Sequence, residues 1–204
     1  MMFKSMSDIE AIETTCNQNI EFIAETPRLI LREFNKDDWE EIHPYSVDEE
    51  VTRFMPWGPN TEDDTIAFVE RALKEKDKNP RKEYHFVVIE KSSGCLIGAV
   101  EIAVGGYKDL NGMLGYCYSR KSWERGIGTE AAGVLIKYGF ESLGLHRIWA
   151  DCDALNYGSQ RVLEKNGMRR EGLFKKKSFI KGEWRDDLHY AILREEWEAR
   201  RTTP

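Results

Sequence analysis

Trp-Glu-Arg-Gly-Ile-Gly-Thr-Glu, residues 123–130, joins a strand-like run at 113–118 to a helical run at 131–143. Two glycines at such a turn leave the backbone N–H groups uncovered by side chains. The first turn of a helix adds free N–H groups and the positive end of the helix dipole. The sequence therefore predicts a phosphate-binding turn at this point of the chain.

The composition around this turn is that of an ordinary globular chain. Its 204 residues are 41% hydrophobic and 32% charged, which is enough for one domain with a full core. The net charge of −6 argues against general affinity for nucleic acid, which needs a basic surface. No apolar run approaches the roughly 18 residues of a spanning helix. We expect neither a nucleic-acid partner nor a membrane partner.

The cysteines and histidines show no spacing typical of a metal site. The cysteines are Cys16, Cys95, Cys117 and Cys152, and no two of them form a C-x-x-C pair. Reduced thiols fit a cytoplasmic protein, and the N-terminus lacks the apolar core of a signal peptide. We therefore expect a cytoplasmic protein without a metal ion.

Apolar periodicity predicts an alternating series of strands and helices. The expected strands are 28–34, 84–90, 95–104, 113–118, 146–152, 168–177 and 183–193. The expected helices are 37–45, a helix from Thr61 to the Asn79-Pro80 pair, 131–143 and 156–165. This order predicts a mixed α+β sheet of about seven strands with helices on both faces. We expect one domain over 25–198 and an N-terminal extension over 1–24.

Several short motifs stand in a characteristic order and spacing. They are Thr-Pro-Arg-Leu-Ile-Leu-Arg at 26–32, Gly115-Tyr116, the turn at 123–131, and the segments 138–148, 156–159, 162–168 and 171–172. With these motifs the chain resembles the GNAT superfamily of acyl-CoA N-acyltransferases. It resembles in particular the RimJ/RimL-like branch of ribosomal-protein alanine N-acetyltransferases, in which an aromatic residue such as Trp123 is common at the head of the turn. The resemblance implies a twisted, mostly antiparallel sheet whose central strands, 113–118 and 146–152, splay apart.

The resemblance also implies a binding site for acetyl-CoA as co-substrate. The pyrophosphate would lie on the turn headed by Trp123, against the backbone N–H groups of Arg125, Gly126, Ile127, Gly128, Thr129 and Glu130. The pantetheine arm would lie in the gap between the splayed strands. A backbone N–H near Tyr116, Cys117 and Tyr118 would polarise the thioester carbonyl, and Asn156 would hydrogen-bond the arm.

For catalysis the resemblance implies direct attack of an amine on the thioester, without a covalent enzyme intermediate. Many relatives carry a tyrosine as proton donor to the leaving thiolate, where this chain has Leu163. Ser159 is the donor that the branch uses instead, and capping of the helix is its alternative role. RimL-type enzymes place a glutamate base in the last hairpin, where this chain has Ser178. Our catalytic candidates are Ser159, Glu101 and Tyr116.

Glu101 is the best carboxylate candidate for a base. It stands between two apolar residues on an expected strand, and alternation turns it away from them, towards the acceptor cleft or towards solvent. Tyr84 and His85 are a second option, with packing as their alternative role. Phe54 and Trp57 are candidates for the acceptor pocket or for the core.

These features together predict an acetyl-CoA-dependent N-acetyltransferase acting on a primary amine. An α-amine with a pKa near 8 needs less help from a base than a lysine-type amine near 10.4, so a protein or peptide N-terminus is the first acceptor. Two alternatives stay open: transfer to a small amine (polyamine, amino acid or antibiotic), and a non-catalytic acyl-CoA-binding module. Cys117 is expected to be a buried thiol. Relatives often dimerise, so the resemblance permits a homodimer.

Overall fold

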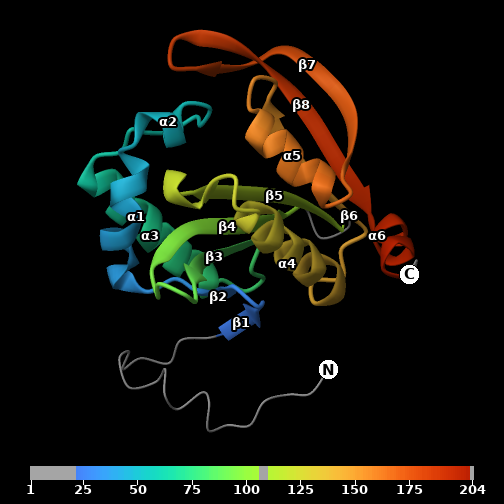
Figure 1. Ribbon diagram of the computed structural model, residues 1–204, viewed down its shortest axis with the longest axis horizontal. Coiled ribbons are helices and arrows are strands. Elements are labelled where there is room, and N and C mark those ends of the chain that lie inside the picture. Colours follow the sequence, from blue (N-terminus) through green and yellow to red (C-terminus); the bar gives the residue numbers. More distant parts are fainter. Residues whose placement is uncertain (1–21, 106–109, 203–204) are drawn as a thin grey trace, which may run out of the picture.

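The computed structural model describes residues 22–105 and 110–202, whose strands form one sheet of eight strands (Figure 1). The strands are β1 (Phe22–Glu25), β2 (Leu29–Glu33), β3 (Glu83–Glu90), β4 (Leu96–Val104), β5 (Asn111–Tyr118), β6 (Arg147–Asp153), β7 (Arg169–Ile180) and β8 (Glu183–Leu193). Their order across the sheet is β1-β2-β3-β4-β5-β6-β8-β7. Neighbouring strands run antiparallel except β5 and β6, which are parallel. The predicted mixed sheet, mostly antiparallel, is confirmed.

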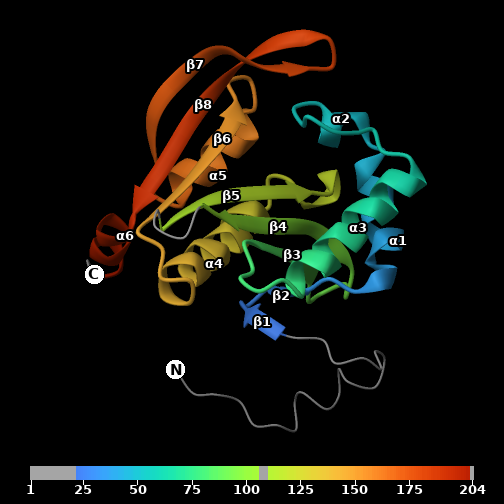
Figure 2. The same cartoon turned by 180° about the vertical axis from the view of Figure 1, so that it is seen from behind.

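The helices pack on both faces of this sheet (Figures 1 and 2). They are η3 (Lys36–Asp38), α1 (Trp39–Ser46), α2 (Glu49–Thr52), α3 (Glu62–Lys76), η4 (Arg120–Ser122), α4 (Ile127–Glu141), α5 (Tyr157–Lys165) and α6 (Arg194–Thr202). α4 packs against β2, β4, β5 and β6, while α1 packs against β4 and α3 against β3. Two separate core clusters result, one under α4 and one under α1 and α3.

Strand β3 shows how period-two alternation divides its residues between the clusters. Phe86 and Val88 belong to the cluster under α4, and Val87 between them belongs to the cluster under α1 and α3. All three are fully buried. A strand covered on both faces therefore reads as a continuous apolar run.

The centre of the sheet opens between β5 and β6. Their parallel pairing covers Asn111–Met113 against Arg147–Trp149 and does not extend along the rest of either strand. Beyond these pairs the two strands line opposite sides of one cavity. This separation of the central strands positions the candidate site.

Several elements differ from the expectations, among them the one-turn helix α2, which was not expected. Helix α4 starts at Ile127, before the expected residue 131, because two glycines with weak helix propensity conceal its first turn. Residues 22–24, which we expected in the extension, form with Glu25 the edge strand β1. α6 was not expected, and it packs through Trp197, whose ring lies 5.2 Å from that of Phe140.

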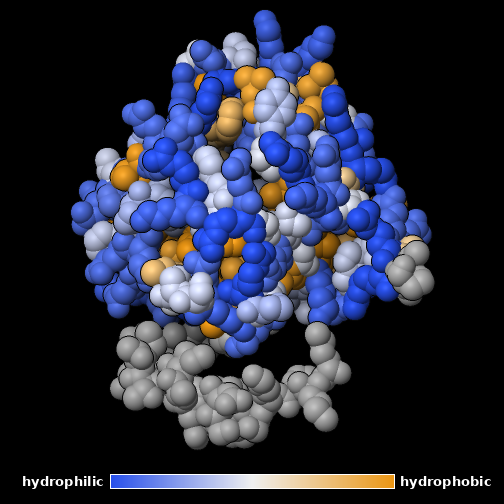
Figure 3. Space-filling view, viewed as in Figure 1, coloured by the Kyte–Doolittle hydropathy of each residue, from blue (hydrophilic) through white to orange (hydrophobic). Residues whose placement is uncertain are grey.

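The surface is mostly hydrophilic on the face shown in Figure 3. Near its turn, the long β7–β8 hairpin nevertheless exposes Phe179 at 62% and Trp184 at 60%, whose rings lie 5.2 Å apart. At its turn, the Lys181 ammonium donates to the backbone oxygen of Thr52 at 2.6 Å, which joins the hairpin to α2. Over the described ranges, no helix has the length and apolar character needed to cross a membrane.

Candidate active site

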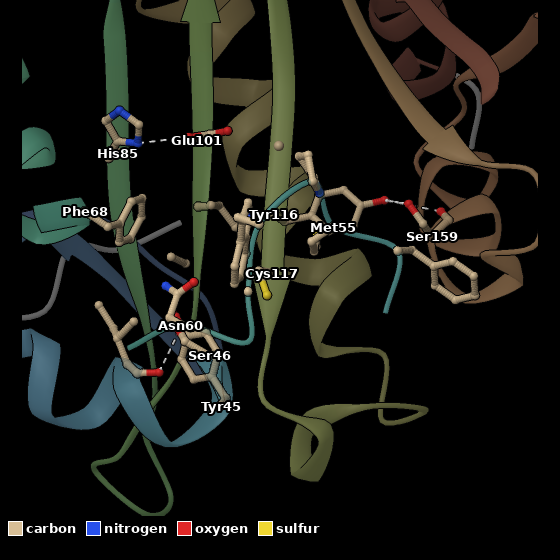
Figure 4. Close-up of a pocket in the computed structure, with 18 of the residues that line it drawn as sticks. Tyr45, Ser46, Met55, Asn60, Phe68, His85, Glu101, Tyr116, Cys117 and Ser159 are labelled. Atoms are coloured by element: carbon tan, nitrogen blue, oxygen red, sulfur yellow. Dashed lines mark hydrogen bonds and ion pairs between the residues drawn. The ribbon is translucent and has the colours of Figure 1, made fainter. Parts of the chain in front are cut away.

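A cavity of about 970 Å³ lies where β5 and β6 separate (Figure 4). Its walls come from α1, the loop after α2, α3, β3, β4, β5, β6 and the start of α5. Phe54 and Trp57 both line it, as the sequence suggested for an acceptor pocket. The cavity also contains Glu101, Tyr116, Cys117, Asn156 and Ser159, five residues that we selected from the sequence.

The backbone of β5 presents polar groups to this gap. The N–H of Ser119 donates to the carbonyl of Ile97, and that of Gly105 to the carbonyl of Asn111, both at 2.9 Å. In an antiparallel ladder the hydrogen-bonding direction alternates along each strand. Odd-numbered residues of β5 therefore bond to β4, and the N–H groups of Tyr116 and Tyr118 point towards the gap.

The turn before α4 has the backbone shape of an anion site. Gly126 is the N-cap residue with a φ of 75°, and no side chain caps the helix. Glu124, two residues earlier, also has a positive φ, of 59°. The first N–H groups of α4, from Ile127 onward, have no partner four residues back in the helix and point out of its end. Such a turn suits a phosphate group.

The side chains of the turn are mostly used for structure. Trp123 is 42% exposed, and its indole N–H donates to the carbonyl of Tyr118 at 3.0 Å. Arg125 pairs with Glu90 at the end of β3. Ile127 is 1% exposed and belongs to the core, so the phosphate site would use its backbone alone.

Gly128 has a packing role that the sequence did not show. A Cβ at this position would lie 3.1 Å from Cε2 of Tyr118 and 3.3 Å from Cγ2 of Val162. The glycine thus lets α4 approach β5 and α5 closely, and the Tyr118 hydroxyl donates to its carbonyl at 3.4 Å. The neighbouring Thr129 carbonyl accepts from Asn166 at 3.1 Å, which ties α4 to the end of α5.

Ser159 and Tyr116 face each other across the gap. Their hydroxyl oxygens are 2.8 Å apart, and either can be the donor. Asn156 caps α5 by accepting the backbone N–H of Ser159 at 3.0 Å, so the serine hydroxyl is not the helix cap. Burial raises the pKa of Tyr116 well above its ordinary value, and this phenol stays protonated at neutral pH.

Glu101 lines the cavity and belongs to a three-residue charge group. Its Oε2 lies 3.0 Å from Nδ1 of His85, whose Nε2 lies 3.1 Å from Oε2 of Glu83. The contact with Glu101 is an ion pair without the alignment of a hydrogen bond. A Cβ at Gly115 would lie 2.6 Å from Glu101 Oε1, so this glycine leaves room for the carboxylate.

The charges around this group decide its protonation. Burial opposes the charge on Glu101, but His85 and then Arg71 outweigh it and lower the pKa of the carboxyl. Burial also opposes protonation of His85, but Glu101 and Glu83 outweigh it and raise the pKa of the imidazole. Glu101 is thus a stable anion and a weak base. It is well suited to hold an ammonium group.

Three further residues that the sequence singled out have structural roles. Burial raises the pKa of the Cys117 thiol to about 12, which leaves no thiolate for attack at neutral pH. Ser178 donates to Oδ2 of Asp187 at 2.5 Å and is not among the cavity residues. Leu163, at the position of the tyrosine donor in many relatives, is 1% exposed in the core.

Sequence reasoning did not select Arg71 and Glu83. Arg71 lies on α3 and lines the cavity, and Glu83 begins β3. Arg71 could have been found from its spacing, because it follows Phe68 by three residues and residues three apart share a helix face. Glu83 and His85 are two apart on one strand, which places both on the same face of the sheet.

The residues present fit acetyl-CoA. The turn at 124–128 offers unblocked N–H groups to a pyrophosphate, and the opened β5 edge offers the N–H groups of Tyr116 and Tyr118 to an extended arm. Ser159 lies at the same gap, where a thiol would leave. Over residues 22–105 and 110–202, no group of three or more His, Cys, Asp or Glu residues is arranged to hold a metal ion.

Three comparisons with known proteins indicate the same family for this chain. A family model described as the acetyltransferase (GNAT) domain matches residues 28–169. The uncharacterized N-acetyltransferase YnaD of Bacillus subtilis is 40% identical over 172 residues, which cover 84% of this chain and 97% of the relative. A crystal structure of a GNAT-family acetyltransferase from Bacillus anthracis has 38% identity and a TM-score of 0.75, covering 85% of this chain and 99% of that chain.

A more distant relative has a named acceptor. The spermidine N(1)-acetyltransferase of Escherichia coli strain K12 is 26% identical over 175 residues, covering 85% of this chain and 90% of the relative.

Proposed function

Since the chain belongs to the GNAT family of acetyltransferases and is an acetyl-CoA-dependent N-acetyltransferase, we propose that its acceptor is the α-amine of a peptide or protein N-terminus. The observation that carries this proposal is the Glu101–His85 pair in the cavity. We also propose that the chain belongs to the RimJ/RimL-like branch, and Trp123 at the head of the turn supports this proposal.

The lowered pKa of Glu101 makes it a weak base, so the acceptor must supply its own free amine. At pH 7 an α-amine with a pKa near 8 is about 10% neutral, whereas an alkyl amine near 10.4 is about 0.04% neutral. The difference of roughly 250-fold favours the α-amine in a site of this kind. Glu101 would attract the ammonium form, and the proton would leave to water as the neutral amine forms.

The remaining roles follow from position. Acetyl-CoA supplies the thioester, whose carbonyl carbon forms a bond to the amine nitrogen as its bond to sulfur breaks. One of the two outward N–H groups of β5, that of Tyr116 or that of Tyr118, would donate to the carbonyl oxygen, and the other would donate to the pantetheine arm. The nitrogen that has formed the new bond loses one proton to water. Ser159 would donate its proton to the leaving sulfur and regain one from water, and the Tyr116 hydroxyl, 2.8 Å away, would hold the serine in place. The backbone N–H groups from Arg125 to Thr129 would bind the pyrophosphate, since that of Glu130 donates to the carbonyl of Gly126 at 3.1 Å, and Asn156 would contact the pantetheine arm.

A polyamine is the second candidate acceptor. Four carboxylates line the cavity, those of Asp64, Glu101, Asp151 and Asp153, against the basic side chains of Arg71 and His85. Asp151 already pairs with Lys177 and His189, and the other three carboxylates favour an acceptor with more than one positive charge. A spermidine-acetylating relative supports this alternative.

A thiol-release assay with matched acceptors tests the proposal. We expect turnover with a lysine-containing peptide that has a free N-terminus and none with the same peptide acetylated at its N-terminus. Spermidine is the third acceptor. Turnover with spermidine alone would replace the proposal by the second candidate, and equal turnover of the two peptides would contradict an α-amine acceptor.

A further inference from the structure

Arg28 connects the segment before β2 with the turn before α4. Its Nη1 donates to the backbone oxygen of Arg125 at 2.8 Å, and its Nε donates to Oε2 of Glu130 at 2.7 Å. These partners are 97 and 102 residues away along the chain. One guanidinium thus contacts the peptide that precedes Gly126 and the first turn of α4.

The first contact fixes the orientation of a peptide plane. In a trans peptide the C=O and N–H groups point in opposite directions. Because the carbonyl of Arg125 points at Arg28, the N–H of Gly126 in the same plane points away from Arg28. Gly126 has a φ of 75°, and a Cβ there would lie 3.5 Å from Nη2 of Arg28. If this plane turned over, a carbonyl oxygen would replace the N–H and repel an anion.

The second contact neutralises a charge. The Glu130 carboxylate lies in the first turn of α4, where it interacts well with the helix dipole but repels a pyrophosphate. Burial opposes its charge, but Thr26 and Arg28 outweigh it, so the pKa of Glu130 is lowered and the carboxyl stays ionised. Arg28 is the cation that forms an ion pair with it.

We propose that Arg28 is a positioning residue for the nucleotide end of acetyl-CoA. It holds the 125–126 peptide with its N–H available to the pyrophosphate, and it offsets the charge of Glu130. The inference rests on the proposed function of the turn at 125–130 as the pyrophosphate site. Arg28 acts through these protein groups and not through contact with the reacting atoms.

Two acetyl donors separate this role from a general effect on folding. Acetyl-CoA carries the pyrophosphate, whereas S-acetylpantetheine carries the same thioester and arm without phosphate. In Arg28→Met we expect the KM for acetyl-CoA to rise about 10- to 100-fold, as loss of charged hydrogen bonds implies, with little change in kcat. The kcat/KM for S-acetylpantetheine stays at the wild-type value. Both donors are measured with the same preparation of each variant. The ratio of kcat/KM for acetyl-CoA to kcat/KM for S-acetylpantetheine therefore does not depend on the folded fraction.

Two further variants complete the test. Arg28→Lys keeps the charge but lacks the fork that reaches both partners, so we expect it to recover only part of the affinity for acetyl-CoA. Arg201→Met is the matched control, since it removes an arginine that donates to Glu141 at the opposite end of α4. Arg201→Met should leave the ratio of the kcat/KM values for the two donors at the wild-type value.

Three results would overturn the inference. The first is an unchanged KM for acetyl-CoA in Arg28→Met, and the second is an equal fall in kcat/KM with both donors. The third is a wild-type KM for acetyl-CoA in Arg28→Lys, which would reduce the role of Arg28 to its charge alone. A wild-type enzyme that uses both donors equally well would show instead that the turn is not the pyrophosphate site. That outcome removes the premise, and it is distinguishable because it appears before any substitution at Arg28.

Discussion

Replacing Gly126 by alanine tests the left-handed turn at the start of α4. The backbone has a φ of 75°, which costs a residue with a Cβ about 1–2 kcal/mol. The new Cβ meets Nη2 of Arg28 at 3.5 Å, an ordinary contact that adds nothing. We therefore expect Gly126→Ala to lower the free energy of unfolding by about 1–2 kcal/mol, which corresponds to a fall of roughly 2–8 °C in Tm for a chain of this size.

Gly128→Ala is the matched control for this change. Gly128 lies within α4, where alanine gains about 1 kcal/mol of helix propensity. The close approach of its Cβ to Tyr118, at 3.1 Å, opposes that gain. We expect a stability within about 1 kcal/mol of the wild type.

Thermal unfolding and calorimetric titration with CoA measure both consequences. If Gly126→Ala leaves the left-handed region, the N–H groups of the turn lose their alignment, and we expect the Kd for CoA to rise about tenfold. A Gly126→Ala protein with wild-type Tm and wild-type affinity would refute the reasoning. So would a larger loss of stability in Gly128→Ala than in Gly126→Ala.

Three other substitutions have defined outcomes. Ser159→Ala should lower kcat about 10²-fold with little change in acetyl-CoA affinity, as steady-state kinetics would show; full activity would remove it from proton transfer. Glu101→Gln should lower kcat/KM for the amine and also lower the pKa of His85 followed by NMR, and an unchanged pKa would contradict the ion pair. In the wild type, protonated His85 stabilises the fold through its carboxylate partners, because its pKa is higher in the folded than in the unfolded chain. This stabilisation is fully present below about pH 6.5, the ordinary pKa of histidine, and is lost as the pH rises through the raised pKa of the folded protein. Arg32→Met breaks a buried ion pair in which Nη1 and Nη2 of Arg32 each donate to Asp38 at 2.7 Å. It should lower the free energy of unfolding in urea by about 3–5 kcal/mol, because the buried aspartate loses its cation. A fall of less than about 1 kcal/mol would show that other groups compensate the charge of the aspartate.

Local patterns predicted the elements with strong periodicity or clear caps. Thr61 caps the start of α3 as expected, with a capping box to Asp64, because both residues of this signal lie within one four-residue segment. The four-residue edge strand β1 and the start of α4 were missed, since a short strand has little periodicity and glycines conceal a first turn. α6 carries acidic residues in its first turn and basic ones in its last, a dipole signal that was present in the sequence.

The candidate site depended on contacts that no local pattern records. Alternation placed Glu101 opposite its apolar neighbours, but only the fold shows that this face also carries His85 and α3. The hydroxyl pair of Tyr116 and Ser159 joins residues 43 apart in the chain. Such pairs follow from sheet order and helix placement, and a single sequence does not specify either.

The short pairing of β5 with β6 has a mechanical consequence. Within residues 22–105 and 110–202, the sheet consists of two parts, β1–β5 and β6–β8–β7, whose strands pair with each other at Asn111–Met113 along the β5–β6 boundary. α4 packs against strands of both parts, so it acts as a brace between them. A ligand held at the N-terminus of α4 therefore contacts one of the elements that couple the two parts, beside the Lys181–Thr52 and Tyr116–Ser159 contacts. Its binding should slow amide exchange on both sides of the cavity together, because α4 contacts strands on both sides.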